Sequence, residues 1–315
     1  MSAATAGPTS TQPPLPTPPT PAKSLRDTVT AYIGLTKPRI IELLLVTTVP
    51  TMVVAERSLP DLWLVVATLV GGTLSAGGAN TINSYWEQDL DEVMVRTARR
   101  PLVNHRVPPA NALRFGVLLG VLGFVWLALT VNLLTAALST AGLLVYVFVY
   151  TIGLKRRSPL NIVIGGAAGC FPVLAGWAAV TGRVDVPALL LFAVVFYWTP
   201  PHFWALAIKY REDYRRAGVP MLPVVAGVEH TARQIVLYTL MMVAVSLMFG
   251  AVASMSVLYL VAALLLGGWF LKLSLDLVRD GSEEMAMRMF RYSISYLGLL
   301  FTAMAVDAVL MGPLG

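Results

Sequence analysis

Polar side chains recur at every fourth position at the end of the second apolar segment of the chain. The sequence from Asn83 to Pro101 reads NSYWEQDLDEVMVRTARRP. On a helix, Asn83, Glu87 and Asp91 would lie along one face, with a rise of about 6 Å between neighbours. Mg²⁺ accepts one or two carboxylates and keeps its other positions for water and substrate phosphate. The spacing therefore predicts a metal and diphosphate site, with simple pairing of the acids to the following arginines as the alternative.

A second acidic segment, from Thr199 to Pro223, spans the end of the sixth apolar segment. It reads TPPHFWALAIKYREDYRRAGVPMLP and sets acids beside bases. Asp213 lies 122 positions after Asp91. Pro159, which opens the fifth apolar segment, lies 121 positions after Pro38, which opens the first. These offsets indicate a four-helix unit used twice, with one acidic site in each copy, unless two landmarks agree by chance.

The composition of the chain is that of a membrane protein. Hydrophobic residues make up 57% of the 315 residues, charged residues make up 13%, and the mean hydropathy is +0.72. A helix needs about 20 apolar residues to cross the hydrocarbon core. We therefore predict an all-α polytopic bundle of nine transmembrane helices, at residues 38–56, 62–86, 112–131, 134–153, 159–181, 187–208, 233–253, 256–275 and 290–311.

The placement of the basic residues predicts the orientation of this bundle. Of the 23 lysines and arginines, all except Arg57 and Arg183 fall on one side of the predicted membrane. Cytoplasmic loops carry this excess, so the N-terminus and both acidic segments are expected in the cytoplasm, and the C-terminus on the opposite side. The net charge of +6 thus reflects topology, and no nucleic-acid partner is expected.

The first residues of the chain do not resemble a targeting signal. Residues 1–30 are rich in proline and threonine and are predicted to be a disordered tail, which leaves 31–315 as the membrane domain. The tail lacks the apolar core of a secretory signal and the arginine pattern of a transit peptide, which favours a bacterial plasma membrane. Cys170 is the single cysteine, which excludes an intramolecular disulfide and a cysteine metal cage.

The acidic motif resembles that of the UbiA-type prenyltransferases, which is Asn-x-x-x-Asp-x-x-x-Asp. Here it stands as Asn83, Glu87 and Asp91, with a glutamate that keeps the charge and lengthens the reach. Within that superfamily the chain resembles the protohaem IX farnesyltransferases, or haem O synthases, over nearly everything after residue 30. The matching strings are LTKPRIIELLLVTT at 35–48, RTARRPL at 96–102, YTIGLKRRSPLNIVIGG at 150–166, PVLAGW at 172–177, WTPPHFWALAIKYREDYRRAGVPMLPVV at 198–225 and SISYLGLLFTAMAVD at 293–307.

This resemblance implies transfer of the farnesyl group of farnesyl diphosphate to a vinyl group of protohaem IX (haem B), giving haem O at the cytoplasmic face. Haem B would be a substrate and not a prosthetic group. Asn83, Glu87, Asp91 and Asp213 would hold Mg²⁺ against the diphosphate. A partnership with haem A synthase or an oxidase assembly factor is left open. The expected substrate-binding residues are Arg96, Arg100, Lys155, Arg39, Lys209 and Tyr150.

His202 is a further candidate catalytic residue. It follows two prolines within an apolar segment, where an ionisable group is costly and so is a functional candidate. It could ligate haem iron, bond a propionate or contact the diphosphate, or it could simply be satisfied by a backbone carbonyl.

Two other functions compete with this interpretation. A duplicated bundle with polar groups near helix ends could be a transporter, although a transporter would place its charges nearer the bilayer midplane. Within the enzymes, a prenyltransferase acting on a quinone precursor or another aromatic acceptor would carry the same acidic motif. The WTPPHFWALA string disfavours that acceptor by resemblance alone.

Overall fold

The computed structural model describes residues 24–312, without the side chains of residues 39–45. Most of the predicted tail therefore lies outside the described residues, and its last part, residues 25–30, is helical. Throughout the described part the secondary structure is helical and contains no strand. The elements are α1 (Leu25–Thr36), α2 (Pro38–Glu56), α3 (Leu62–Trp86), α4 (Gln88–Val93), α5 (Pro109–Thr130), α6 (Leu133–Leu144), η1 (Val145–Leu154), α7 (Asn161–Gly165), η2 (Gly166–Cys170), α8 (Phe171–Thr181), α9 (Val186–Lys209), α10 (Arg211–Arg216), α11 (Leu222–Val225), α12 (Gly227–Val252), α13 (Val257–Asp280) and α14 (Glu283–Met311).

Among the described residues, eight helical segments are long and apolar enough to cross a membrane. They coincide with eight of the nine predicted segments. Elements α6 and η1 together form one of these spans, and elements α7, η2 and α8 together form another. Helix α2 has the predicted bounds of the first segment, 38–56, but its side chains are described only from Val46 onward. The all-α membrane bundle is thus confirmed, and the count of nine stays a prediction.

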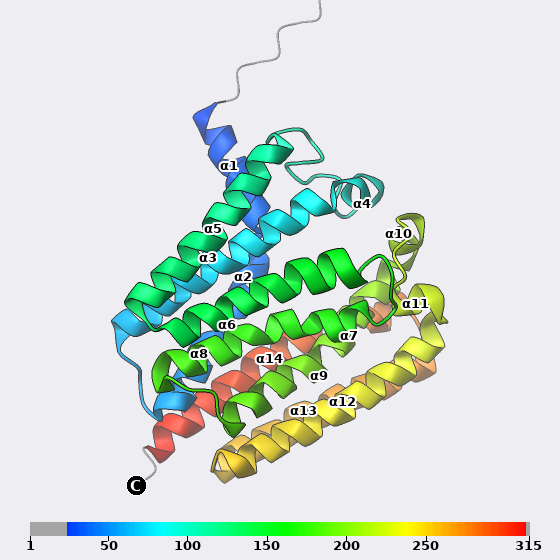
Figure 1. Ribbon diagram of the computed structural model, residues 1–315. Coiled ribbons are helices and arrows are strands. Elements are labelled where there is room, and N and C mark those ends of the chain that lie inside the picture. The colour runs from blue at the N-terminus through cyan, green and yellow to red at the C-terminus, as the bar shows by residue number, and fades with distance from the viewer. Residues whose placement is uncertain (1–23, 313–315) are drawn as a thin grey trace, which may run out of the picture.

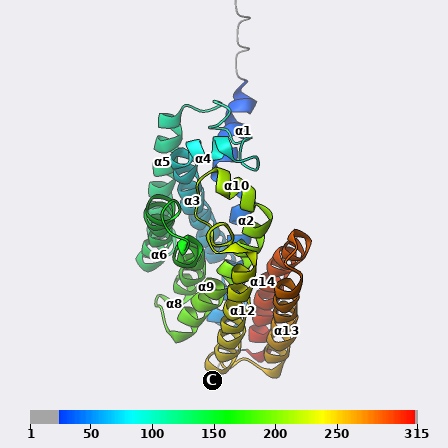
Figure 2. The same cartoon turned by 90° about the vertical axis from the view of Figure 1, so that its right-hand side faces the viewer.

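The two acidic segments emerge at the same end of the bundle. Helices α3 and α9 each run toward this end and are followed by a short helix, α4 and α10 respectively (Figures 1 and 2). The most extensive helix pairings are α3 with α5 and α9 with α12, which are the second and third helices of the two predicted units. This recurrence supports the predicted repeat.

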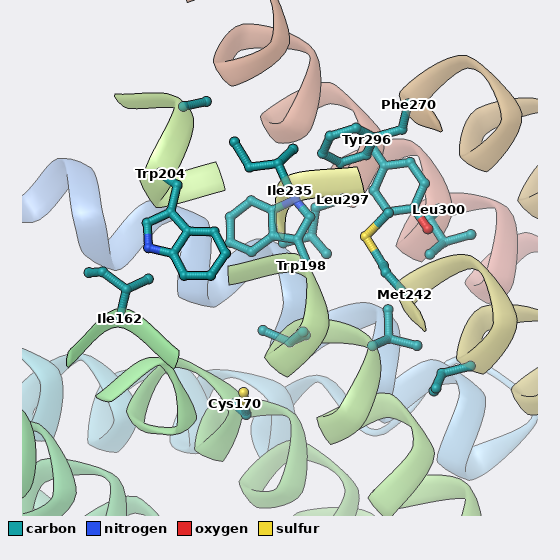
Figure 3. Packing of buried hydrophobic residues seen from close by; sticks show 14 of the residues in the cluster. Ile162, Cys170, Trp198, Trp204, Ile235, Met242, Phe270, Tyr296, Leu297 and Leu300 are labelled. Carbon is teal, nitrogen blue, oxygen red and sulfur yellow. The ribbon is translucent and has the colours of Figure 1, made fainter. Parts of the chain in front are cut away.

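The buried core of the second half is rich in aromatic residues. Trp198 and Trp204 come from α9, Ile235 and Met242 from α12, and Tyr296 from α14 (Figure 3). Because lipid offers no hydrophobic driving force between helices, close packing and interhelical hydrogen bonds must hold these elements together. One such bond joins the Trp198 Nε1 donor to the carbonyl of Ser293, at 2.8 Å. Helix α9 is thereby fixed against α14.

Small residues set the distance between α3 and α5. A Cβ added to Gly78 would lie 2.7 Å from the carbonyl oxygen of Gly116 and 2.9 Å from the amide nitrogen of Gly120. A Cβ added to Gly123 would lie 3.0 Å from the amide nitrogen of Ser75. Backbones this close leave no room for larger residues, as is usual where membrane helices pack through glycines. The crossing fixes α3, whose end carries the acidic motif.

We expect Gly78→Ala to lower the free energy of unfolding by about 2 kcal/mol, because the new methyl group must push backbone atoms apart. Thermal unfolding in detergent would measure the loss. Gly72→Ala on the same helix is the matched control, since a Cβ there meets nothing within 4 Å. Equal melting temperatures for the two variants would contradict a close α3–α5 crossing.

Asp307 has a structural role at the start of α13. Its buried carboxylate accepts hydrogen bonds from the amide of Ser256 at 2.8 Å, from the amide of Tyr259 at 3.3 Å and from the Ser256 hydroxyl. These are donors that the first turn of a helix leaves without intrahelical partners. The carboxylate of α14 therefore caps α13.

Asp307→Ala is expected to lower the free energy of unfolding by about 3 kcal/mol, since it leaves buried donors unpaired. Asp307→Asn keeps acceptor oxygen and should lose less than half of that amount. Melting temperatures of both variants, with turnover of the surviving folded protein, test the assignment. A stable Asp307→Ala protein without activity would contradict a purely structural role.

Candidate active site

Asn83, Glu87 and Asp91, here called the acidic stripe, remain one helical turn apart although helix α3 ends between them. Glu87 caps α3 outside helical geometry (φ −104°, ψ 16°), and the chain re-enters a helix at once in α4. The amide of Glu87 still donates to the carbonyl of Asn83, at 3.0 Å, and the amide of Asp91 to that of Glu87, at 2.9 Å. These bonds keep the spacing of one turn. All three side chains are buried, with 1%, 2% and 3% exposure.

Each of the three polar side chains faces a different cation. Lys37 donates to Asn83 Oδ1 at 2.6 Å, and Lys155 donates to Glu87 Oε1 at 2.5 Å. The Arg100 guanidinium contacts both oxygens of Asp91, at 2.5 and 2.7 Å. The alternative of simple acid–arginine pairing thus holds for Asp91 alone. Its neighbours in the stripe pair with lysines from elsewhere in the chain.

The π-helical segment η1 forms the side of the site that faces Asn83 and Glu87. In η1, Thr151 Oγ1 donates to the carbonyl of Tyr146, and the Lys155 amide donates to that of Tyr150, both at 2.9 Å and both across five residues. Thr151 accepts from Asn83 Nδ2 at 2.9 Å, so Thr151 and Lys155 face Asn83 and Glu87. π-Helical turns are often found at functional sites.

Electrostatics couple these groups. Burial, together with the positive charge of Arg100, lowers the pKa of the Lys37 ammonium to about 7. Burial alone would raise the pKa of Glu87, but the charges of Lys155 and Lys37 and the hydrogen bond from Lys155 hold it below its usual value. Glu87 therefore stays ionised despite its burial. The stripe presents negative oxygens inside a ring of cations.

Asp89 lies outside this cluster. Its side chain is 64% exposed and forms an ion pair with Arg156 at 2.6 Å. The hydrogen bond from Arg156 lowers the pKa of Asp89, and the same bond raises that of Arg156. Asp89 and Arg156 thus form an ion pair at the surface, whereas the carboxylates of Glu87 and Asp91 pair with their cations in the interior.

The second acidic segment reaches the first through Tyr210. The guanidinium of Arg96 lies 5.9 Å from the centre of the Tyr210 ring, and the ammonium of Lys209 lies 5.6 Å from it. Asp213 is buried in α10 and pairs with Arg216. The structure therefore brings the segments together at an exposed pair of cations.

The carboxylates do not form a ready metal cage. Among residues 24–38 and 46–312, whose side chains the structure describes, no three Asp, Glu, His or Cys side chains are grouped closely enough to hold a metal ion. The donor set of Asn83, Glu87 and Asp91 supplies only oxygen, and each donor has a cation beside it. Such a set fits Mg²⁺ bound through one or two carboxylates and the phosphates of a substrate, with the cations free to turn toward those phosphates.

His202 lies in an aromatic cluster, apart from the acidic stripe. Its ring stacks between Trp198 and Phe290, with centroids 4.3 and 4.6 Å away, and Nδ1 lies 2.6 Å from Ser293 Oγ. The Ser293 hydroxyl donates its proton to the carbonyl of Phe290, at 2.6 Å. It can therefore only accept from Nδ1, which leaves the lone pair of a neutral imidazole on Nε2.

The remaining predicted residues divide between the site and its surroundings. Tyr150 is half-buried, and its ring centre lies 5.6 Å from the Lys155 ammonium. The side chain of Arg39 lies outside the described residues. Sequence reasoning assigned no site role to Lys37 or Thr151. Only the pairing of η1 with α3 could have identified Thr151, and Lys37 was interpreted as one of many topology-determining cations.

Comparison with known proteins shows strong similarity along the chain. A model of the UbiA prenyltransferase family matches residues 44–299. A protein named protoheme IX farnesyltransferase from Parafrankia sp. (strain EAN1pec) is 57% identical over 287 residues, which cover 90% of this chain and 92% of that protein. A protein of the same name from Frankia alni is 56% identical, over 89% of this chain and 98% of its own.

Solved structures share the fold at low identity. A structure described as digeranylgeranylglyceryl phosphate synthase superposes with a TM-score of 0.75 at 17% identity, over 90% of this chain and 99% of its own. A UbiA homolog from Archaeoglobus fulgidus, bound to DMAPP and Mg²⁺, gives a TM-score of 0.60 at 16% identity, over 87% and 99% of the two chains. At these identities the similarity shows the fold alone.

Proposed function

The chain belongs to the UbiA prenyltransferase family, and we propose that it transfers the farnesyl group of farnesyl diphosphate to a vinyl group of protohaem IX, giving haem O. It is a membrane-embedded prenyltransferase. The acceptor is supported by relatives named protoheme IX farnesyltransferase, which match most of the chain at more than half identity. Family membership disfavours the transporter alternative.

One observation carries the assignment of the site. Three buried oxygen-bearing side chains, Asn83, Glu87 and Asp91, stand in a row, and each faces a cation from a different part of the chain. Alternating charges of this kind suit a metal diphosphate, whose metal needs oxygens and whose phosphates need cations.

Asn83, Glu87 and Asp91, with Asp213 from the second segment, would hold Mg²⁺ at this end of the bundle. Bound there, the metal would supply Lewis-acid stabilisation of the departing diphosphate. The Archaeoglobus fulgidus homolog bound to DMAPP and Mg²⁺ supports this choice of metal. The longer Glu87 side chain reaches its lysine partner across to η1 and remains long enough to turn toward a metal.

The cations of the site would neutralise the negative charge of the departing diphosphate. Lys155 and Arg100 lie beside the acids and would release them to bind phosphate oxygens, because phosphate offers the same charge with more acceptors. Arg96 and Lys209 are exposed around Tyr210 and would contact the diphosphate as it enters. Tyr150 and Arg39 complete the expected substrate contacts.

An apolar groove offers a surface for the farnesyl chain. It has a volume of about 520 Å³ and lies between α1, α3 and α5. Thr36, one residue before Lys37, lines it, together with Tyr32, Leu74 and Phe115. An apolar chain leaving the diphosphate site could lie along this groove, which keeps the reactive carbon near the cations. Ionisation would then leave an allylic cation, which must meet the vinyl group before water. Bond formation would move the positive charge onto the haem side of the former vinyl group, where water would add and lose a proton, giving a hydroxyethylfarnesyl chain.

His202 would act on the haem side of the reaction. With its lone pair on Nε2, the ring can ligate iron, whereas bonding to a propionate or a diphosphate would require it to donate. We therefore favour iron ligation among the roles that the sequence left open. Aromatic stacking on both faces would fix the ring for this purpose.

His202→Phe is expected to change the absorption spectrum of protein-bound haem, because an axial nitrogen ligand is lost, while binding of farnesyl diphosphate stays within about threefold of wild type. Phenylalanine keeps the stacking on Trp198 and Phe290. Spectroscopy of the haem complex is the measurement. An identical spectrum in the variant would exclude ligation by this histidine.

The chain is a multi-pass membrane protein, and we place it in a bacterial plasma membrane with the site on the cytoplasmic face. The N-terminus would then be cytoplasmic and the C-terminus on the other side. The excess of lysine and arginine beside α4 and α10 supports this orientation. An association with haem A synthase or an oxidase assembly factor stays a proposal.

Turnover by the purified protein in detergent tests the function. Farnesyl diphosphate and protohaem are supplied with and without Mg²⁺, and the pigment is analysed by mass. A Mg²⁺-dependent hydroxyethylfarnesyl adduct is the expected result. Prenylation of an aromatic acid or quinone precursor, with no haem product, would keep the metal site but overturn the acceptor.

A further inference from the structure

Arg57 is a cation that neither the topology nor the active site explains. It is one of two basic residues on the side of the membrane opposite the acidic segments, and it ends helix α2 with a left-handed backbone (φ 57°). The other, Arg183, pairs with Asp185 at 3.2 Å. Among the described residues, no carboxylate forms an ion pair with Arg57, whose Nη2 donates to the carbonyl of Ala253.

A small cavity beside Arg57 is lined by two hydrogen-bond donors that have no acceptor in the described part of the protein. It has a volume of about 190 Å³ and is lined by Arg57 and Trp177 together with apolar side chains from α2, α9 and α12. Arg57 Nη1 and Trp177 Nε1 are buried, and neither has an acceptor in the described part of the protein. Trp177 is only 6% exposed. Guanidinium and indole nitrogens can only donate hydrogen bonds, and buried donors are normally paired. A ligand with acceptor oxygens would satisfy both.

The cavity lies at the depth of lipid headgroups. Arg57 follows the last residue of α2, Pro187 is the second residue of α9, and Val252 is the last of α12. Trp177 stands one turn before the end of α8. These helix ends lie at the end of the bundle away from α4 and α10 (Figure 1). Helix ends of spanning segments lie at the membrane interface, where phosphates of the lipids are found.

We propose that this cavity binds a phosphate oxyanion, supplied by the headgroup of a phospholipid in the leaflet opposite the active site. Arg57 and Trp177 donate to the phosphate oxygens, and the apolar wall contacts the glycerol and the first acyl carbons. A planar guanidinium matches phosphate geometry, and an amphipathic tryptophan is typical of this depth. The bound lipid would join α2, α8, α9 and α12 and so stabilise the bundle.

Lipid titration of the delipidated, full-length protein in detergent tests the proposal without any variant. Phosphatidylglycerol is expected to raise the melting temperature saturably and to remain bound, one per chain, in native mass spectrometry. Diacylglycerol with the same acyl chains lacks the phosphate and should do neither. Inorganic phosphate at the same concentration should have no effect, because it lacks the apolar contacts. An equal shift with diacylglycerol, or a shift with inorganic phosphate alone, would overturn the lipid phosphate as ligand.

Variants locate the site. Arg57→Gln should weaken binding of phosphatidylglycerol about tenfold, since a charge-assisted hydrogen bond is lost, and Trp177→Phe, which removes only the indole donor, should weaken it several-fold. Arg183→Gln removes the other cation of the same side and should bind as wild type does. Unchanged binding in both Arg57→Gln and Trp177→Phe would overturn the site. Farnesyl transfer by these variants is expected to stay close to wild type, because neither residue lies near the acidic stripe.

Discussion

Asp91→Asn is expected to lower kcat/KM for farnesyl transfer about 1000-fold, which corresponds to about 4 kcal/mol of transition-state stabilisation. Asparagine has the same shape and keeps an acceptor for Arg100, but it removes the charge that a metal ligand supplies. The loss should appear in the rate at saturating farnesyl diphosphate, because the charge on the leaving group is greatest in the transition state. Steady-state turnover at several Mg²⁺ concentrations measures it.

Asp89→Asn provides the matched control on the same short helix. Asp89 is a surface carboxylate with its own arginine partner, so its neutralisation removes a similar charge at a similar place in the sequence. Its turnover should stay within about threefold of wild type, since exposed ion pairs contribute little. Equal losses in the two variants would indicate a general effect of charge on the loop. Unchanged turnover in Asp91→Asn would remove Asp91 from the site.

The apolar segments were predictable because the bilayer imposes a sharp contrast on the sequence. The bounds 38–56 and 62–86 agree with α2 and α3, where Pro38 opens one helix and Asp61 caps the other. Helices α12 and α14 begin six and seven residues before the predicted segments. Hydropathy detects only the part of a helix that lies in lipid, and both helices continue into polar sequence beyond it.

The spacing of the acidic stripe was also predictable, because hydrogen bonds between residues four apart continue from α3 into α4. The partner was predictable only for Asp91, because its Arg100 is one of the arginines that follow the motif. Lys37 reaches Asn83 from 46 positions away, and Thr151 and Lys155 reach α3 from 68 positions away. The register between these elements depends on the packing of α3 against α1 and η1 and on the π-helical turns of η1, and no local sequence pattern predicts either.

His202 shows the same limit. Its position within an apolar helix marked it as a candidate, but its tautomer depends on Ser293, 91 residues further along the chain. Asp213 was placed correctly at the same end of the bundle as Asp91. Whether it joins Asn83, Glu87 and Asp91 in the proposed metal site depends on the approach of two short helices, which the sequence does not fix.

Lys155→Gln is expected to lower kcat/KM about 100-fold, or about 2.7 kcal/mol, because a half-buried cation beside the proposed diphosphate site is lost. Arg156→Gln is the matched control, since Arg156 is the next residue and pairs with the surface carboxylate Asp89. It should stay within about threefold of wild type. A similar loss in both variants would contradict a specific role for Lys155.

A double variant separates catalysis from simple stabilisation of Glu87. In this structure Lys155 neutralises Glu87, so Lys155→Gln could act merely by leaving a buried carboxylate unpaired. If that were the whole effect, Glu87→Gln/Lys155→Gln would recover turnover, since no charge remains unpaired. If Glu87 binds the metal and Lys155 binds the phosphate, both functions are lost, and the double variant stays at least as impaired as either single one. Thermal unfolding should show the opposite pattern. The double variant would regain the stability that Lys155→Gln loses, because neither glutamine leaves a buried charge unpaired.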